Sequence, residues 1–330
     1  MSTPPRSHPP AHPPRPPRSH RVPAAFALIT AVTLALTSCG SGGGNTADGA
    51  APAGRSAKIP TADVVSSVRK DEAAARLLPS SVRDRGTLRI ASSVGGTPPG
   101  ALYLEDGRTI VGQDIDFADA VAEVLGLRLE REAASFEAIL PALGSGKYDL
   151  GTGNFGVTEE RRRTIDFVTY INDGQGFAVR ADSELKKVTD LGQLCGLNVA
   201  TGAGTTFEVT LEENKHVCEE AGKEPYAVKT YAEPGAVWPA LRQGRADVVM
   251  STINGLRYAV RQQEGLRFLG EYRRLDVGFA FKKGTKLAPA FRAAVDRLIE
   301  DGTYDRILKK WGTRGSAIGK SRISPPETKG

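Results

Sequence analysis

The stretch that decides the fold reads Asp149-Leu150-Gly151-Thr152, then a glycine-rich loop, then Thr158-Glu159-Glu160-Arg161. Its short apolar run predicts a β-strand that ends at the loop. Thr158 is a good N-cap, and the two glutamates after it favour a helix start because they complement the positive end of the helix dipole. A strand, a loop and a capped helix in this order form the repeating unit of an α/β protein.

The same unit recurs on both sides of this stretch. Asp114 is predicted to cap a helix that Gly126 ends, and Thr205 a helix in the second half of the chain. We expect strands at 88–91, 127–129, 197–201, 228–231, 246–250 and 277–281, and further helices at 136–143, from 252, at 287–300 and at 303–311. This alternation predicts parallel or mixed sheets covered by helices, here as two lobes.

Residues 1–38 have the pattern of a secretory signal peptide. Four arginines and no acid precede an apolar run of about 15 residues, shorter than the roughly 20 that a membrane span needs. The run closes on Leu36-Thr37-Ser38-Cys39, which resembles a bacterial lipobox. This predicts lipidation of Cys39 and anchoring on the extracytoplasmic face of the bacterial cell membrane. An uncleaved anchor helix is the alternative.

Changes in composition mark the remaining boundaries. Residues 39–62 are mostly Gly, Ala, Ser and Pro, which predicts a flexible tether. Residues 63–85 are predicted to be a leading helical segment, with one helix over 63–78 that stops at Pro79. Residues 315–330 are polar and contain Pro325-Pro326, so we expect a disordered tail.

Charge and histidine content exclude several function classes. Without residues 1–38, 40 Lys and Arg oppose 38 Asp and Glu, a net charge of +2, so no basic face argues for nucleic acid. His216 is the single histidine after Cys39, and its polar surroundings disfavour a Ser-His-Asp hydrolase or a histidine-rich metal site. We therefore expect no catalytic residue, no metal and no cofactor.

Cys195 and Cys218 are predicted to form a disulfide. The predicted compartment is oxidising, and the cysteine count is even once Cys39 carries lipid. Two buried free thiols are the alternative.

Four motifs in the right order resemble those of the polar amino-acid solute-binding proteins, family 3, of bacterial ABC importers. They are Gly112-Gln113-Asp114-Ile115-Asp116-Phe117, residues 136–143, residues 158–167, and Asp301-Gly302-Thr303-Tyr304 with Lys310-Trp311-Gly312. The resemblance implies a type II periplasmic-binding-protein-like fold, with a ligand cleft between two lobes that are each a mixed sheet flanked by helices. It places lobe 1 at 86–179 and 272–314 and lobe 2 at 180–271, joined by strands that cross near 177–180 and 275–281.

The resemblance also implies a function. Such a protein is a monomer that closes on an amino acid or a related carboxylated solute and delivers it to a membrane permease of an ABC importer. Two alternatives share the fold: a dehydratase-like enzyme that uses a cleft carboxylate as general acid, and a ligand sensor for a signalling partner. The scarcity of histidine argues against the enzyme.

Ligand-binding positions follow from the same resemblance. Arg161 would hold the ligand's carboxylate, since a guanidinium fork pairs with both oxygens, although a solvated helix face is the alternative. Phe136 would pack on the ligand, or else belong to the core. The other predicted positions are Ser93, Gly153, Asn154 and Gly156 in lobe 1, and Gly202, Thr205, Thr206 and Thr252 in lobe 2.

Two positions depart from the family pattern. Thr252 and Ser93 stand where family members carry the acids that receive a ligand's ammonium. Because a buried ammonium without a charged partner is costly, either another acid such as Glu208 supplies the charge or the ligand is not a standard α-amino acid. The usual first aromatic residue is also absent. Tyr103 and Trp238 are candidates to replace it, although Trp238 is also typical of a core position.

Overall fold

Two α/β lobes share one continuous β-sheet in the computed structural model, which describes residues 59–328. The first lobe contains α1 (Glu72–Arg76), α2 (Ser80–Arg85), β1 (Thr87–Ser93), β2 (Leu102–Tyr103), β3 (Ile110–Val111), α3 (Gln113–Leu125), β4 (Arg128–Ala134), α4 (Phe136–Ser145), β5 (Leu150–Gly156), α5 (Glu159–Arg162), α10 (Ala288–Glu300) and α11 (Thr303–Trp311). The second contains η1 (Leu191–Leu194), β7 (Asn198–Gly202), α6 (Thr206–Glu213), α7 (His216–Glu220), β8 (Ala227–Tyr231), η2 (Pro234–Ala236), α8 (Val237–Arg242), β9 (Val248–Thr252) and α9 (Ile253–Gln262). The predicted two-lobed α/β fold is confirmed.

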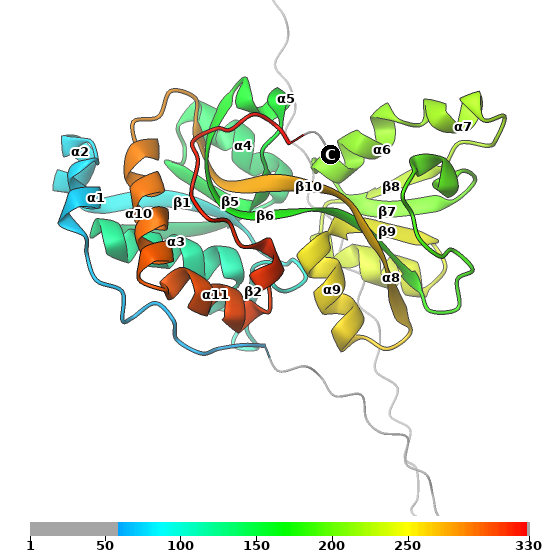
Figure 1. Cartoon of the computed structure of the whole chain (residues 1–330), viewed down its shortest axis with the longest axis horizontal. Helices are drawn as coiled ribbons and strands as arrows, with labels where there is room; N and C mark the ends of the chain where they lie inside the picture. The colour runs from blue at the N-terminus through cyan, green and yellow to red at the C-terminus, as the bar shows by residue number, and fades with distance from the viewer. Residues whose placement is uncertain (1–58, 329–330) are drawn as a thin grey trace, which may run out of the picture. The chain divides into compact units, whose positions relative to one another are not determined.

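Two long strands, β6 (Ile165–Arg180) and β10 (Leu266–Lys282), run through both lobes, which lie on either side of their middle (Figure 1). They are antiparallel neighbours from one end to the other. The full sheet has the order β4-β1-β5-β10-β6-β9-β7-β8, so this pair separates two parallel sets of three strands. Each lobe therefore has a mixed sheet, and the carboxyl ends of the parallel strands face the space between the lobes, where ligands bind in open α/β sheets.

Each lobe has its own apolar core. In the first lobe, α3 buries Phe117 and Val121 against α10 and α11, because its apolar residues recur at helical spacing. The ring of Tyr170 lies between those of Phe117 and Phe279, at centroid distances of 5.2 and 4.6 Å. Each such buried aromatic side chain contributes about 2 to 3 kcal/mol through removal of apolar surface from water. Two separate clusters, one containing Met250 and the other Val249, fill the second lobe.

The chain crosses between the lobes earlier than predicted. Phe177, Ala178 and Val179 belong to the cores of the second lobe, whereas the predicted boundary placed them in the first. The crossing lies near Gly174, where β10 approaches so closely that an added Cβ would be 2.1 Å from the Arg273 carbonyl oxygen. β6 is buried almost throughout, so its apolar content does not mark the point at which it leaves one lobe.

The leading segment differs from the single helix predicted over 63–78. The Asp63 carboxylate accepts from the backbone N–H groups of Val65 and Ser66 at 2.9 and 3.0 Å, which forms a turn in place of a helix. A helix starts only after Asp71, whose side chain accepts from the N–H of Ala74 at 2.8 Å. A local side-chain hydrogen bond thus outweighs the helical spacing of the apolar residues.

Residues 313–328 pack along the first lobe, although disorder was predicted from residue 315. The N–H of Thr169 donates to the carbonyl of Arg322, and the N–H of Ser324 donates to the carbonyl of Phe167, both at 2.9 Å. These bonds occupy an edge of β6 that β9 does not cover. The polar composition was misleading, because an edge strand binds backbone groups whatever side chains they carry.

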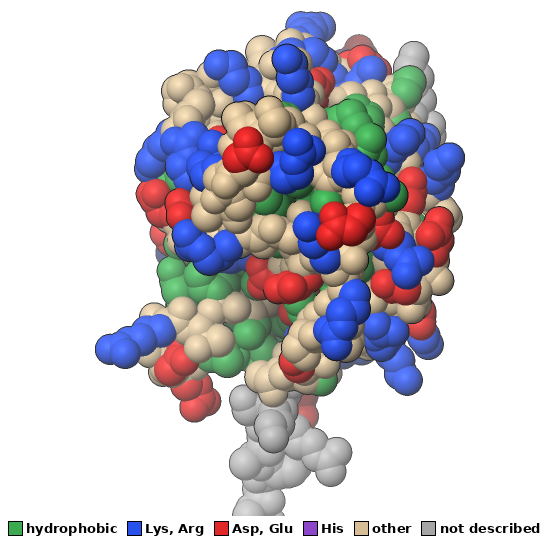
Figure 2. Space-filling view, turned by 90° about the vertical axis from the view of Figure 1, so that its left-hand side faces the viewer, with side chains coloured by type: hydrophobic (Ala, Val, Ile, Leu, Met, Phe, Trp, Pro, Cys, Tyr) green, Lys and Arg blue, Asp and Glu red, His purple; other side chains and the backbone are tan. Residues whose placement is uncertain are grey.

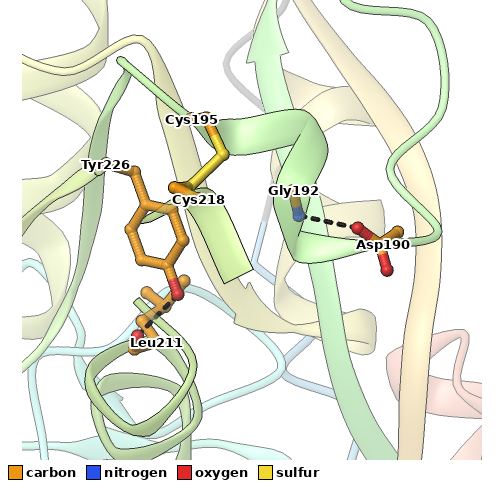
Figure 3. The surroundings of a disulfide bond; sticks show 6 residues. All are labelled: Asp190, Gly192, Cys195, Leu211, Cys218 and Tyr226. Carbon is orange, nitrogen blue, oxygen red and sulfur yellow. Dashed lines mark hydrogen bonds between the residues drawn. A yellow bond between two sulfur atoms is a disulfide. The ribbon is translucent and has the colours of Figure 1, made fainter. Parts of the chain in front are cut away.

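The predicted disulfide between Cys195 and Cys218 is confirmed. It joins the end of η1 to α7, with the two Cα atoms 5.6 Å apart (Figure 3). Close to it, the Tyr226 hydroxyl donates to the carbonyl of Leu211 at 2.6 Å. The bond therefore braces an outer part of the second lobe that is made of short helices.

Several predictions concern residues outside the described part of the chain. The signal peptide, the lipidation site Cys39 and nearly all of the tether over 39–62 lie before residue 59. Within residues 59–328, no helix has both the length and the apolar character that crossing a membrane requires.

Removing the disulfide is expected to destabilise the protein. A Cys195→Ser/Cys218→Ser variant frees a loop of 23 residues in the unfolded chain, which should lower the free energy of unfolding by about 3 kcal/mol. Urea unfolding followed by circular dichroism measures the change. A reductant should lower the stability of the parent but not that of the variant, and equal stability of the two oxidised proteins would contradict the expectation.

Candidate functional site

Three strand-to-helix loops face the space between the lobes, and each is fixed by a threonine. Thr158, Thr205 and Thr252 are the N-caps of α5, α6 and α9. Their hydroxyl oxygens accept from the backbone N–H groups of Arg161, Glu208 and Gly255 at 3.2, 3.3 and 3.0 Å. The caps hold the loops after β5, β7 and β9 in defined positions around the cleft.

Two of the cavities between the lobes, of about 120 and 350 Å³, share Phe136 as a lining residue. Seven predicted positions line the smaller cavity: Ser93, Phe136, Gly153, Asn154, Gly202, Thr205 and Thr252. Phe136, Arg161 and Thr206 line the larger one. Gly156 lines neither, and instead its carbonyl accepts from Nη1 of Arg161. The structure thus brings the predicted residues together around one interlobe space.

Arg161 is a cation that reaches both lobes. Its Nη1 and Nη2 donate to the carbonyl oxygens of Gly156 in the first lobe and Gly204 in the second, both at 3.1 Å. The guanidinium carbon lies 5.8 Å from the ring centroid of Phe136 and 6.0 Å from that of Phe155. Burial lowers the pKa of Arg161 to about 10. Neutral carbonyls are its hydrogen-bond partners in the described part of the chain, and the nearby Glu160 offsets part of the lowering of its pKa. Arg161 forms no ion pair among these residues, so a ligand anion could pair with it directly.

Asp114 is a buried carboxylate on the smaller cavity, and its predicted role as a helix cap is wrong. α3 begins at Gln113 after Gly112, which leaves Asp114 inside the first turn with 4% of its surface exposed. It accepts from the Tyr170 hydroxyl at 2.7 Å. Burial raises the pKa of Asp114 to about 6, and this hydrogen bond offsets only part of the effect. A sequence pattern does not show which way a first-turn acid points, so this residue was missed.

Asn154 lines the same cavity and has a buried side-chain oxygen without a hydrogen-bond partner among the described residues. Its backbone takes a left-handed conformation with φ 56°, which asparagine tolerates better than most residues. Nδ2 donates to Oδ2 of Asp173 at 3.0 Å, while Oδ1 is buried with no partner among residues 59–328. Burial raises the pKa of Asp173 to about 6. This oxygen is buried beneath the cavity surface, so a ligand N–H group would reach it only if the Asn154 side chain moved.

Besides the predicted Phe136, the aromatic residues of the smaller cavity are ones that the sequence did not suggest. Tyr103 is 44% exposed and lines neither cavity, whereas Phe207 and Tyr231 line the smaller one. Trp238 belongs to the core of the second lobe. Its Nε1 also donates to Oγ1 of Thr97 in the first lobe at 2.6 Å, so the lobes touch here as well as at Arg161. The cleft is therefore closed.

Two other ionisable residues, Glu208 and His216, lie away from these two interlobe cavities. Glu208 accepts from the N–H of Gly204 at 2.6 Å and lines neither cavity, so it stabilises its own loop. His216 is exposed, with Nδ1 3.0 Å from the carbonyl of Glu213. No three His, Cys, Asp or Glu side chains within the described range are grouped as metal ligands.

On the outer face of the first lobe, basic and acidic side chains are interspersed (Figure 2).

The model of one protein family, the bacterial extracellular solute-binding proteins of family 3, matches residues 88–314. The chain belongs to this family. The arginine-binding protein ArgT of Corynebacterium glutamicum is 32% identical over 251 residues, which cover 75% of this chain and 81% of that protein. The ABC transporter glutamine-binding protein GlnH of Bacillus subtilis is 31% identical over 216 residues, or 61% and 72% of the two chains.

Solved structures agree with this family 3 assignment. An ancestral arginine-binding protein bound to arginine has a TM-score of 0.61 at 33% identity, and the match covers 69% of this chain and 98% of that one. An ancestral amino acid-binding protein, described as a precursor of cyclohexadienyl dehydratase, has a TM-score of 0.62 at 26% identity, with coverage of 70% and 98%. The predicted type II periplasmic-binding-protein fold is confirmed, and these relatives are named as binding proteins.

Asp114 is expected to make the ligand-free protein less stable as pH rises from 4 to 6. Its pKa is about 6 in the folded protein and 3.8 in an unfolded chain, so the folded state binds more protons in this window and loses stability as they leave. Asp114→Asn should therefore reduce the change in the free energy of unfolding across this pH range by about 3 kcal/mol, since each pKa unit corresponds to about 1.4 kcal/mol. Urea unfolding at several pH values measures it.

Part of the pH dependence of the free energy of unfolding should remain in the Asp114→Asn protein, because burial also raises the pKa of Asp173. Identical slopes for the parent and the variant would show that Asp114 does not titrate in this window.

Proposed function

We propose that this family 3 protein is the extracytoplasmic binding component of an ABC importer, which closes on an amino acid or a related carboxylated solute and delivers it to a permease. The observation that carries the proposal is the Arg161 guanidinium, half-buried on an interlobe cavity with only neutral carbonyls as hydrogen-bond partners in the described chain. A ligand carboxylate would give it two charge-assisted hydrogen bonds in a fixed geometry.

We assign Asp114 as the partner of a cationic or N–H donor group on the ligand. Asp114 and Asn154 line the smaller cavity, while Arg161 lines the larger one, and Phe136 belongs to both. A ligand that meets both ends carries a carboxylate at one end and a cationic or N–H donor group at the other, with its middle against Phe136. Asp114 would then be the acid that replaces those missing at Ser93 and Thr252. Arginine and glutamine, the ligands in the names of the two relatives, both fit this description.

Closure would couple binding to transport. Arg161 and Trp238 already join the lobes through hydrogen bonds to Gly204 and Thr97. A ligand that touches both lobes binds the closed state better than the open state and shifts the population toward it. Only this closed population would present both lobes to the permease in one fixed arrangement.

The N-terminal assignments complete the proposal. Lipidation at Cys39 and the tether over 39–62 would hold a monomer on the outer face of the cell membrane. Globomycin, which blocks processing of lipidated precursors, should leave the protein at its full length in cells.

A second candidate is a dehydratase-like enzyme on the same fold. It is favoured by the carboxyl of Asp114, whose pKa of about 6 suits a general acid, and by the similarity to a precursor of a dehydratase. The two candidates differ in the fate of the ligand. A bound solute that mass spectrometry recovers unchanged after long incubation supports the importer component, and recovery of a dehydrated product supports the enzyme.

Arg161→Ala is expected to weaken binding of every carboxylated ligand. Loss of one partner of a buried charge pair costs about 2 to 5 kcal/mol, which corresponds to at least a thirtyfold higher Kd. Calorimetry on protein stripped of co-purified solute, with a panel of amino acids and amine-free carboxylates, measures the effect. Arg163→Ala is the control, because Arg163 is exposed beside the same helix. A ligand that binds Arg161→Ala as tightly as the parent would refute the carboxylate role.

Asp114→Asn is expected to discriminate between ligand classes. Binding of amino acids with a cationic group near the smaller cavity should weaken by about tenfold or more, whereas amine-free carboxylates should bind as before. In the parent, affinity for the cationic class should fall as pH drops below about 6, since protonation removes the charge of Asp114. Equal weakening of both classes would contradict this assignment.

A further inference from the structure

The C-terminal segment, residues 313–328, leaves α11 and contacts the second lobe at once. Ser316 is 1% exposed and Asn254 of α9 is 6% exposed. The Ser316 hydroxyl accepts from Nδ2 of Asn254 at 2.9 Å and lies 3.1 Å from its Oδ1. One residue earlier, the carbonyl of Gly315 accepts from Nη1 of Arg274 at 3.2 Å. Asn254 directly follows the loop of Thr252, so this contact reaches a helix that begins at the cleft.

The middle of the segment is fixed to the first lobe. The hydroxyl of Ser321 donates to the carbonyl of Thr169 at 2.7 Å, and its N–H donates to Asp296 of α10 at 2.8 Å. Ser324 pairs with Phe167 through both its hydroxyl and its N–H, at 3.0 and 2.9 Å. Residues 321–324 therefore move with the first lobe.

The end of the segment returns to the crossing strands from the other side. Figure 1 shows it leaving α11 below β6 and β10 and ending above them near α5. The carboxylate of Glu327 accepts from the N–H of Glu159, the first residue of α5, at 2.8 Å. It also forms an ion pair with Arg273 of β10, on the second-lobe side of Gly174. Glu327, Arg273 and Arg161 line the same cavity.

We propose that residues 313–328 act as an intramolecular clamp that holds the two lobes closed, with Ser316 and Glu327 as its two contacts to the second-lobe side. The segment is attached to the first lobe in its middle and reaches past the crossing at both ends. Movement of the second lobe about Gly174 would carry Asn254 of α9 away from Ser316. Arg273 pairs with Gln175, one residue past Gly174, so its backbone would move little, and the change there would be a reorientation of its long side chain away from Glu327. Both contacts therefore favour the closed state. Glu327 also holds the start of α5 and is thereby a positioning residue for Arg161.

The chain contains a reporter of this movement. Trp238 and Trp311 are its two tryptophans. Trp311 is 2% exposed in the core of the first lobe, and its Nε1 donates to Asp116 at 2.6 Å. Trp238 contacts Thr97 across the cleft, so opening exposes Trp238 while Trp311 stays buried. Acrylamide quenching of tryptophan fluorescence therefore measures opening without any ligand, and its result does not depend on the proposed substrate class.

The test compares ligand-free full-length parent with Ser316→Ala, Glu327→Ala and the double variant. Each lost contact should raise the ratio of open to closed protein by about two- to tenfold, and the two effects should multiply in the double variant. Glu327→Gln keeps an acceptor for the N–H of Glu159 and should lie between the parent and Glu327→Ala. Glu224→Ala, which replaces an exposed acid of the second lobe, is the matched control. Acrylamide should quench its tryptophan fluorescence to the same extent as in the parent.

Equal quenching of the parent and the double variant would overturn the clamp. So would increased quenching in Glu224→Ala, or increased quenching that appears only together with a lost cooperative unfolding transition, because either would mean general loosening. Increased quenching in the two single variants, with the parent's unfolding transition retained, supports it.

Discussion

The antiparallel pairing of β6 with β10 is the constraint on which the rest of the structure depends. Because these strands stay hydrogen-bonded through both lobes, the lobes are parts of one sheet, and the chain crosses between them near Gly174, where the β10 backbone leaves no room for a Cβ. The parallel strands on either side end at the interlobe space, and their loops carry the capped helices α5, α6 and α9. A binding cleft between lobes follows from this arrangement.

Opposite charges lie at the two ends of that cleft. Arg161 is held by two carbonyls, one from each lobe, and Asp114 by one hydroxyl. Neither forms an ion pair within the described residues, and burial shifts the pKa of each toward its neutral form. Under the proposed function, these two side chains would be complementary to a small molecule that carries both charges, because the ligand would supply an ionic partner for each of them. The same two groups would be a poor fit for an apolar solute.

The sequence predicted this protein best where local chemistry decides the structure. Thr158 and Thr205 cap helices as predicted, a helix begins after Thr252 as predicted, and Cys195 pairs with Cys218. The sequence-based prediction failed where a residue distant in the sequence determines the local structure. Asp114 points inward because Tyr170, 56 residues away, donates to it. The C-terminal segment is ordered because β6 offers an open edge. No periodicity or composition reveals such partners, whereas a family motif pointed to Arg161, which lines an interlobe cavity.

The order in which the lobes occur along the chain has a consequence for how the molecule is made. The second lobe is continuous between β6 and β10, whereas the core of the first requires Phe279, Phe291 and Trp311 from the last sixth of the sequence. A chain that emerges from its N-terminus first would therefore hold an incomplete first lobe until synthesis or export is nearly finished. Its apolar surface on α3 would stay uncovered during that time, which makes the late arrival of α10 and α11 the step most exposed to aggregation.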